Sequence, residues 1–218
     1  MQNVKTLGLS MLTMLSVSAV MAVSASGDTL TAQGYPAVLT GTADEGFKDT
    51  VTTTAGTVSC PEPKYDATIT GPITTAGSVS VSPTFPHTGC TAFGFPATVD
   101  MNGCVYVFRV LAGTSGDVDL ECSGSNELTV TATSAGILKC TVHVKAQTDL
   151  GGAVKYTNTG GGGATVEANL SGIDYTHTQG TGLGSCLGGS ATSGTLTLKA
   201  IFKAETEGGA ATTALFSA

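Results

Sequence analysis

Tryptophan is absent from this chain, and aromatic residues make up only 6% of its 218 residues. Charged residues are also scarce, at 11%, and the formal net charge is −7. Proteins that bind nucleic acid normally carry a basic surface, so this charge argues against a nucleic-acid partner. Disordered chains combine high net charge with few apolar residues, whereas 41% of this chain is hydrophobic. The composition therefore predicts a folded, acidic protein.

The first 25 residues have the order of an export signal. Lys5 is the only charged residue among them, and an apolar stretch runs from Leu7 to Ala22. This stretch is shorter than the roughly 20 residues of a membrane-spanning helix. Small residues then offer cleavage sites after Ala22 or Ala25, of which we favour Ala25. We expect 1–25 to be a signal peptide and the mature chain to be secreted or attached to the cell surface, without spanning a membrane.

All six cysteines lie after this leader. They are Cys60, Cys90, Cys104, Cys122, Cys140 and Cys186. An even number in an exported chain predicts three disulfides, although spacing alone leaves 15 connectivities. None forms a CxxC pair or a Cys/His spacing that suits zinc. We expect the bridges to supplement a hydrophobic core, each contributing about 2–4 kcal/mol.

Strand alternation predicts one of the pairings. If Cys104 faces Cys122 across a hairpin, the large apolar side chains meet on one face and an arginine meets an aspartate on the other. The facing pairs are then Tyr106 with Leu120, Phe108 with Val118, Val107 with Asp119, and Arg109 with Asp117. A slip of one residue would invert the two faces. We therefore predict a Cys104–Cys122 disulfide.

An internal repeat suggests the other two pairings. Residues 51–60 and 130–140 each run Val-Thr-x-Thr, then Ala-Gly, then three residues and a cysteine. Equivalent halves would pair Cys60 with Cys90 and Cys140 with Cys186, giving two pseudo-repeats around the central hairpin. Thr, Ala and Gly are so common here that such matches also arise by chance, and both readings stay open.

A second hairpin is expected around the turn at 74–77. Its facing pairs are Tyr65 with Phe85, Ala67 with Pro83, and Ile69 with Val81. Cys60 lies an odd number of residues before Tyr65, so in an unbroken strand its side chain would point to the opposite face. A bridge from Cys60 therefore requires Pro61 and Pro63 to break the strand, which proline does readily.

Apolar and polar residues alternate through most of the chain after the leader. Within 128–133, 138–145 and 195–203, hydrophobic residues occupy alternate positions and Thr, Lys or His lie between them, with Ile201 as the exception. This pattern is typical of half-buried antiparallel strands. Threonine suits the wet face of such strands because it is β-branched and its hydroxyl tolerates water.

We therefore predict one all-β domain over 35–205, an antiparallel β-sandwich or barrel-like fold stapled by disulfides. The spacing of turn residues suggests about ten to fourteen strands. Residues 26–34 are expected to be a flexible arm, and 206–218 a loose tail or an edge strand. An outer-membrane barrel would need two aromatic girdles, which this composition does not favour.

No catalytic constellation emerges from the motifs. His87, Asp100 and Ser185 follow the order of residues in one class of serine hydrolase. However, Ser185 lacks a Gly-Asp-Ser-Gly-Gly context, and the chain has no Gly-x-Ser-x-Gly elbow. We expect His87 to lie in a loop and Ser185 in a turn, and we assign no catalytic residue.

The sequence also predicts no metal and no cofactor. No histidine, His143 included, has a near carboxylate or cysteine arranged as a ligand. Asp117, Asp119 and Glu121 share one strand face, but successive residues there are about 6.6–7 Å apart. A single Ca²⁺ would need further loop ligands. We favour a solvated acidic stripe facing Arg109 over a calcium site.

The loop over 86–96 is the candidate binding surface, since it holds His87, Phe93 and Phe95 between prolines and beside a cysteine. The alternative is that the two phenylalanines plug one end of the core. Asn169 begins an Asn-Leu-Ser acceptor for N-glycosylation, whose use depends on the host.

Three segments carry a family resemblance over roughly 35–205. They are GCTAFGFPATVDMNGCVYVF at 89–108, KCTVHVKAQ at 139–147 and GTGLGSC at 180–186. The chain resembles an uncharacterised family of exported six-cysteine β-proteins of actinobacteria. The resemblance implies export and paired cysteines, and it carries over no catalytic residues.

These observations lead us to expect a non-catalytic structural or interaction protein of the cell envelope or extracellular space. Its partner is not identified by the sequence, and an envelope component and self-association both stay open. The alternatives are a secreted hydrolase with an unrecognised site and a secreted inhibitor with a disulfide-held loop.

Overall fold

The computed structural model describes residues 29–53, 56–74, 77–85, 89–111, 115–134, 138–159, 162–179, 193–206, 211–212 and 214–217. These residues form eighteen β-strands and no helix, which confirms the all-β class. The expected ten to fourteen strands were too few, because several connections and both ends of the described chain contain short strands of their own. Among the described residues there is no helix with the length and apolar character of a membrane span.

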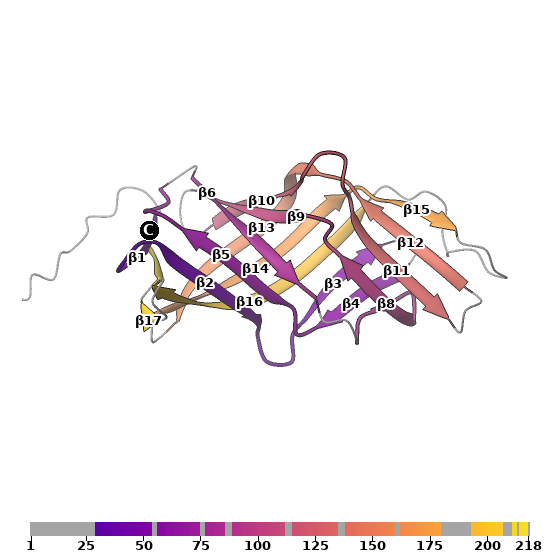
Figure 1. Cartoon of the computed structure of the whole chain (residues 1–218), viewed down its shortest axis with the longest axis horizontal. Helices are drawn as coiled ribbons and strands as arrows, with labels where there is room; N and C mark the ends of the chain where they lie inside the picture. Colours follow the sequence, from indigo (N-terminus) through magenta and orange to yellow (C-terminus); the bar gives the residue numbers. More distant parts are fainter. Residues whose placement is uncertain are drawn as a thin grey trace, which may run out of the picture.

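Eight strands close into an antiparallel barrel (Figure 1). In order around the barrel they are β2 (Ala37–Ala43), β5 (Lys64–Ile69), β6 (Ser78–Thr84), β9 (Cys104–Val110), β10 (Ser115–Cys122), β13 (Gln147–Thr159), β14 (Gly163–Ile173) and β16 (Gly194–Thr206). The ring is closed because β16 pairs with β14 on one side and with β2 on the other. Of the two folds that the sequence left open, the chain therefore adopts the barrel.

Seven further strands continue the same sheet beyond the barrel at one of its ends. They are β3 (Lys48–Thr53), β4 (Gly56–Pro61), β7 (Thr91–Ala92), β8 (Phe95–Asp100), β11 (Leu128–Ser134), β12 (Leu138–Val144) and β15 (Thr176–Gln179). They pair side by side in this order, and β3 joins the first part of β16. We call these seven strands the extension. Barrel and extension lie one after the other along the long axis of the molecule (Figure 1).

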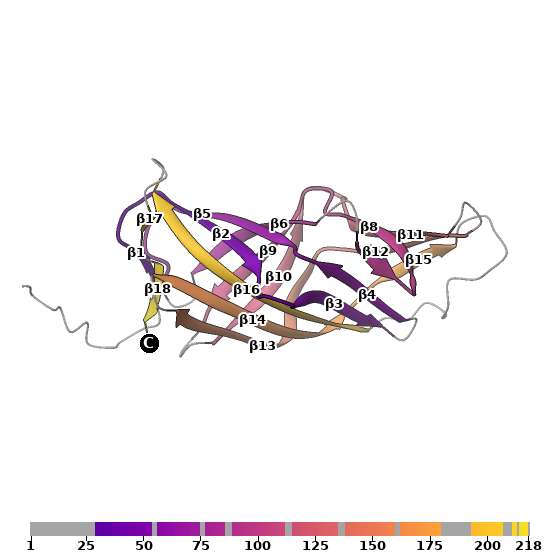
Figure 2. The same ribbon diagram turned by 90° about the horizontal axis from the view of Figure 1, so that it is seen from below.

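The first and last described strands meet at the opposite end of the barrel (Figure 2). There β1 (Thr29–Ala32) pairs with β18 (Ala214–Ser217), and β17 (Ala211–Thr212) pairs with β16. Leu30 of β1 is 2% exposed and belongs to the hydrophobic core. Part of the arm expected at 26–34 is thus a strand that covers the barrel end, and parts of the expected tail are strands as well. The leader at 1–25 lies outside the described residues.

The predicted alternation determines which side chains point inward. Along β5 and β6 buried and exposed residues alternate strictly. The expected register of this hairpin was wrong by two residues, because Tyr65 faces Pro83 and Ala67 faces Val81. A two-residue slip keeps every side chain on its predicted face, so the hydrophobic pattern could not distinguish the two registers.

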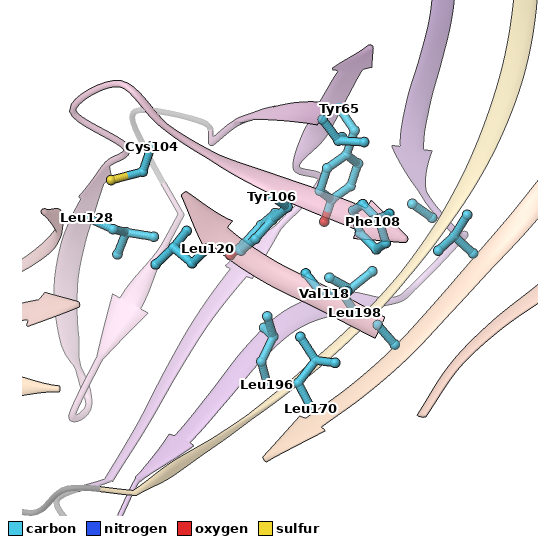
Figure 3. Packing of buried hydrophobic residues seen from close by; sticks show 14 of the residues in the cluster. Tyr65, Cys104, Tyr106, Phe108, Val118, Leu120, Leu128, Leu170, Leu196 and Leu198 are labelled. Atoms are coloured by element: carbon cyan, nitrogen blue, oxygen red, sulfur yellow. The ribbon is translucent and has the colours of Figure 1, made fainter. Parts of the chain in front are cut away.

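The core continues from the barrel into the extension without interruption. Figure 3 shows Tyr106 and Phe108 of β9 packing with Val118 and Leu120 of β10 and with leucines of β16. Eight strands leave an interior that is just wide enough for side chains to fill. The inner space is accordingly occupied by Leu, Val and aromatic side chains.

The central hairpin has the predicted register. Cys104 faces Cys122 and forms a disulfide with it, with Cα atoms 3.9 Å apart. The other facing pairs are also as predicted: Tyr106 with Leu120, Phe108 with Val118, Val107 with Asp119, and Arg109 with Asp117.

The second predicted bridge, Cys60–Cys90, is also present. The strand breaks where the prolines suggested: β4 ends at Pro61, and Glu62 has a φ of 50° before β5 begins. Cys60 and Tyr65 both become buried as a result, despite their opposite parity. Cys140 is disulfide-bonded, and its predicted partner Cys186 lies outside the described residues.

The two repeated segments occupy similar places in the fold. Residues 51–60 span the β3–β4 hairpin, and 130–140 span most of β11 and the start of β12. Their cysteines differ in register, since Cys60 faces Asp49 whereas Cys140 faces Ala132. Each hairpin leads into a barrel strand that carries a buried tyrosine. The segments therefore share topology but not strand register.

Candidate functional site: the outer face of the extension

The loop proposed as a binding surface does not present its phenylalanines to solvent. Phe93 and Phe95 are partly buried and pack against the hydrophobic core. The ring of Phe93 also lies over Gly56, where an added Cβ would be 3.0 Å from it. His87 lies outside the described residues. The placement of the two rings fits the alternative role of closing the core.

The acidic stripe is not solvated along its length, which corrects the sequence-based expectation. Asp119 is fully buried and forms an ion pair with Arg109, whose side chain is 34% exposed. Asp117 is half-buried and only Glu121 is exposed. Val107, which faces Asp119, is also buried. Both faces of the β9–β10 hairpin are therefore covered at this point, which periodicity along a single strand cannot show.

His143 also differs from the expectation, because it has a carboxylate neighbour. Its Nδ1 lies 3.1 Å from an Oε of Glu127, and its Nε2 lies 3.2 Å from the hydroxyl of Thr178. Asp100 accepts a hydrogen bond from the backbone N–H of Asn102 at 2.9 Å. Ser185, which we expected to be a turn residue and not a catalytic one, lies outside the described residues. No group of three or more His, Cys, Asp or Glu side chains is placed to hold a metal within the part of the chain that the structure describes.

Four threonines align across adjacent strands on the outer side of the extension. The Cα register places Thr98 of β8, Thr131 of β11, Thr141 of β12 and Thr178 of β15 in one row. The hydroxyls of Thr131 and Thr141 are 3.4 Å apart. A neighbouring row consists of Asp100, Thr129, His143 and Thr176. We call the outward side chains of these two rows the threonine face.

Similar rows run across the outer face of the adjacent strands β14, β16, β3, β4 and β7. One row is Ser171, Thr195, Thr52 and Thr57, and the next is Asn169, Thr197, Thr50, Ser59 and Thr91. Neighbouring strands lie about 4.7–4.9 Å apart, and same-face residues along a strand lie about 6.6–7 Å apart. The outer walls therefore display hydroxyl groups at regular intervals in two directions. Asn169, the predicted glycan acceptor, is exposed within this pattern.

Sequence reasoning missed these rows although their signal was visible. The alternating threonines identify the wet face of each strand, yet a row exists only once the register between strands is known. The row of four threonines can form hydrogen bonds without ion pairs, because each hydroxyl both donates and accepts.

The interior holds one ionisable pair that the sequence did not indicate. Asp49 points inward from β3, is 6% exposed, and accepts a hydrogen bond from the Tyr65 hydroxyl through Oδ2. Burial raises the pKa of Asp49 to about 6, although the Tyr65 hydrogen bond acts in the opposite direction. Burial and the nearby charge of Asp49 raise the pKa of both Tyr65 and Tyr106 above the usual tyrosine value. The three side chains therefore form a buried polar group within an otherwise apolar core.

Comparison of the chain with protein-family models, with curated proteins and with solved structures finds no match. The fold and the threonine face define the chain as an antiparallel β-barrel protein with a hydroxyl-bearing extension. The resemblance to exported actinobacterial β-proteins stays a prediction.

Proposed function

We propose that this is an exported, non-catalytic interaction protein of the cell envelope or extracellular space, and that it binds through the threonine face. The observation that carries the proposal is the row of four threonines in register on four adjacent strands. A row of this kind needs a stable sheet beneath it, and the Cys60–Cys90 disulfide secures the extension on which it lies. Disulfides persist in oxidising compartments, which supports export.

The chemistry of the threonine face favours an uncharged partner rich in hydroxyl groups. The threonine row carries no charge, and the net charge of the chain is −7, which disfavours an anionic surface. Hydroxyls that donate and accept complement a polymer whose groups do the same. An ordered polysaccharide of the envelope or of the extracellular space fits this description.

Binding to insoluble glycans tests the proposal. The oxidised mature protein is incubated with peptidoglycan sacculi, chitin and cellulose, and the bound fraction is measured by sedimentation. The triple substitution Thr98→Val, Thr131→Val and Thr141→Val removes the hydroxyls but keeps side-chain shape. We expect at least one glycan to retain the wild type and the variant to bind at least tenfold more weakly.

A matched variant controls for general surface effects. Thr40→Val with Thr68→Val makes the same change at exposed positions of the barrel, and we expect it to bind like the wild type. Retention of none of the three glycans, or equal retention of the wild type and the triple variant, would contradict binding through this face. Turnover of an ester, peptide or glycan substrate by the purified protein would contradict the non-catalytic role.

A further inference from the structure

Asp49 is the interior residue that apolar packing does not explain. Its Oδ2 accepts the hydrogen bond from Tyr65, but Oδ1 is buried without a hydrogen-bond partner. Leaving a buried acceptor unsatisfied costs about 1–3 kcal/mol, and more when the group is charged. A chain of this composition could have placed an apolar residue here at no such cost, so the unpartnered oxygen calls for a ligand.

The carboxyl group lines a small internal space. A cavity of about 40 Å³ is bounded by Asp49, Tyr106, Cys60, Phe85 and apolar side chains of the extension. It adjoins a second cavity of about 50 Å³, whose lining is almost entirely apolar. The two share six lining residues, namely Val51, Val58, Tyr106, Leu128, Val130 and Leu196. We call the two cavities together the Asp49 chamber.

The Asp49 chamber has one polar end and an apolar body. Its polar groups near Asp49 are the carboxylate itself and the hydroxyl of Tyr106. Tyr65 does not line the chamber, and its hydroxyl donates to Oδ2. Farther along the chamber the side chains are Val, Leu and Ile, apart from Thr53, Gln147 and Tyr175. Gln147 is engaged with the backbone of Asp174 in both directions.

Water and metal ions fit this space poorly. Among the side chains that line the cavity, a water beside Oδ1 would find only Asp49 and the Tyr106 hydroxyl as partners. That is the lower end of the usual range of about 2–4, and the apolar body would stay unfilled. Ca²⁺ takes about six to eight oxygen ligands and Mg²⁺ about six, whereas Asp49 is the only carboxylate that lines the chamber. A molecule with a cationic hydrogen-bond donor at one end and a short hydrocarbon at the other matches both parts of the chamber.

We propose that the Asp49 chamber binds a small primary amine, whose ammonium group donates to Oδ1 of Asp49 and whose short hydrocarbon tail lies among Val51, Leu128 and Leu196. The ammonium supplies the donor that Oδ1 lacks, and it compensates the buried negative charge. The tail replaces empty space with van der Waals contacts. This site lies where the extension meets the barrel, because side chains of both line it, and it is independent of the threonine face.

Titration with two matched probes tests the proposal at pH 7.5. Isobutylamine carries the ammonium and the hydrocarbon, and isobutanol keeps the shape but not the charge. Methyl and amide NMR shifts are followed on the full, oxidised mature protein. We expect saturable shifts centred on Val51, Val58, Leu128 and Leu196, with isobutylamine binding at least tenfold more tightly than isobutanol.

Two variants assign the binding to the chamber. Asp49→Asn keeps the shape and removes the charge, and we expect it to lose at least tenfold in affinity for isobutylamine. Val130→Ile fills the apolar body while leaving Asp49 intact, and we expect it to weaken both probes. Asp66→Asn changes an exposed carboxylate on β5 and should bind like the wild type.

The outcomes separate clearly. Non-saturable shifts, saturable shifts centred outside the chamber, or equal affinity of the Asp49→Asn variant and the wild type would overturn the proposal. If Asp49→Asn does not fold, the Val130→Ile titration and the ratio between the two probes decide the question by themselves.

Discussion

Asp49 couples the stability of the protein to pH. Its pKa is about 6 in the folded protein, against 3.8 for an ordinary aspartate. The folded state therefore holds this proton more tightly than the unfolded state does. As the pH rises from about 4 to above 6, the contribution of Asp49 to stability is lost, by up to about 3 kcal/mol. Tyr65 and Tyr106, the other titratable groups near it, stay protonated in this range.

We expect Asp49→Asn to remove this pH dependence. The measurement is the free energy of unfolding in urea at pH 4 and pH 7 for the wild type and the variant. Other carboxylates, such as Asp44 beside Lys199 with its lowered pKa, act in the opposite direction but are common to both proteins. The free energy of unfolding of the variant minus that of the wild type should therefore increase as the pH rises. A difference that is the same at both pH values would refute this role of Asp49.

Arg109 balances a buried charge. Asp119 is fully buried and paired with it. Replacing Arg109 with alanine would leave a carboxylate inside the protein without its cation, and we expect a loss of about 3 kcal/mol. The double variant Arg109→Leu with Asp119→Leu removes both charges and should recover part of this loss. Urea denaturation of both variants measures the two effects. If Arg109→Ala is as stable as the wild type, Arg109 does not stabilise the buried charge of Asp119.

At the scale of strands, Gly41 determines how β2 fits between its neighbours. It faces Tyr65 of β5 on one side and Phe202 of β16 on the other. The rings of Tyr65 and Phe202 pack together with centroids 5.9 Å apart. A Cβ on Gly41 would come within 2.6 Å of the Phe202 ring. The missing side chain therefore makes room for an aromatic pair at the seam where the barrel closes.

We expect Gly41→Ala to destabilise the protein by about 1–3 kcal/mol, because Phe202 must leave its position. Gly71→Ala is the matched control, since an added Cβ there would meet no atom within 4 Å. Thermal unfolding of the two variants makes the comparison. Equal midpoints for both would show that the seam tolerates a larger residue.

At the scale of the molecule, both described disulfides lie where the barrel meets the extension. Cys104 begins β9 and Cys122 ends β10, and Cys60 lies next to the last residue of β4. The chain passes between the two parts of the molecule at these points. Cys104–Cys122 joins two barrel strands at the points where the chain arrives from β8 and leaves toward β11, and Cys60–Cys90 joins two segments of the extension.

We expect Cys104→Ser with Cys122→Ser to lower stability by about 3 kcal/mol, as the loop-entropy estimate gives for residues 18 apart in sequence. Amide hydrogen exchange should accelerate more in β11 and β12 than in β14 and β16. Uniform acceleration across all strands would instead mean that barrel and extension unfold as a single unit. Mass spectrometry of the oxidised wild type tests the predicted Cys140–Cys186 bridge directly.

The candidate sites depended on contacts that a linear pattern does not contain. Alternation predicted that Thr131 and Thr141 are outward, but their alignment with Thr98 required the pairing of β8 with β11, strands about 30 residues apart. The burial of Asp49 and Asp119 likewise depends on which segments cover them. Both are polar residues in alternating strands, and sequence alone predicts solvent for such positions.

The amino-acid sequence by itself determined the strand faces, the all-β class and the Cys104–Cys122 register, because each depends on neighbours within one strand or one hairpin. Only the tertiary structure decided that β16 closes the barrel against β2 and β14, and that the hairpin connections assemble into an extension. Those pairings join segments far apart in the chain, and many registers satisfy the same alternation. Which of them forms is decided by how all the side chains pack together at once.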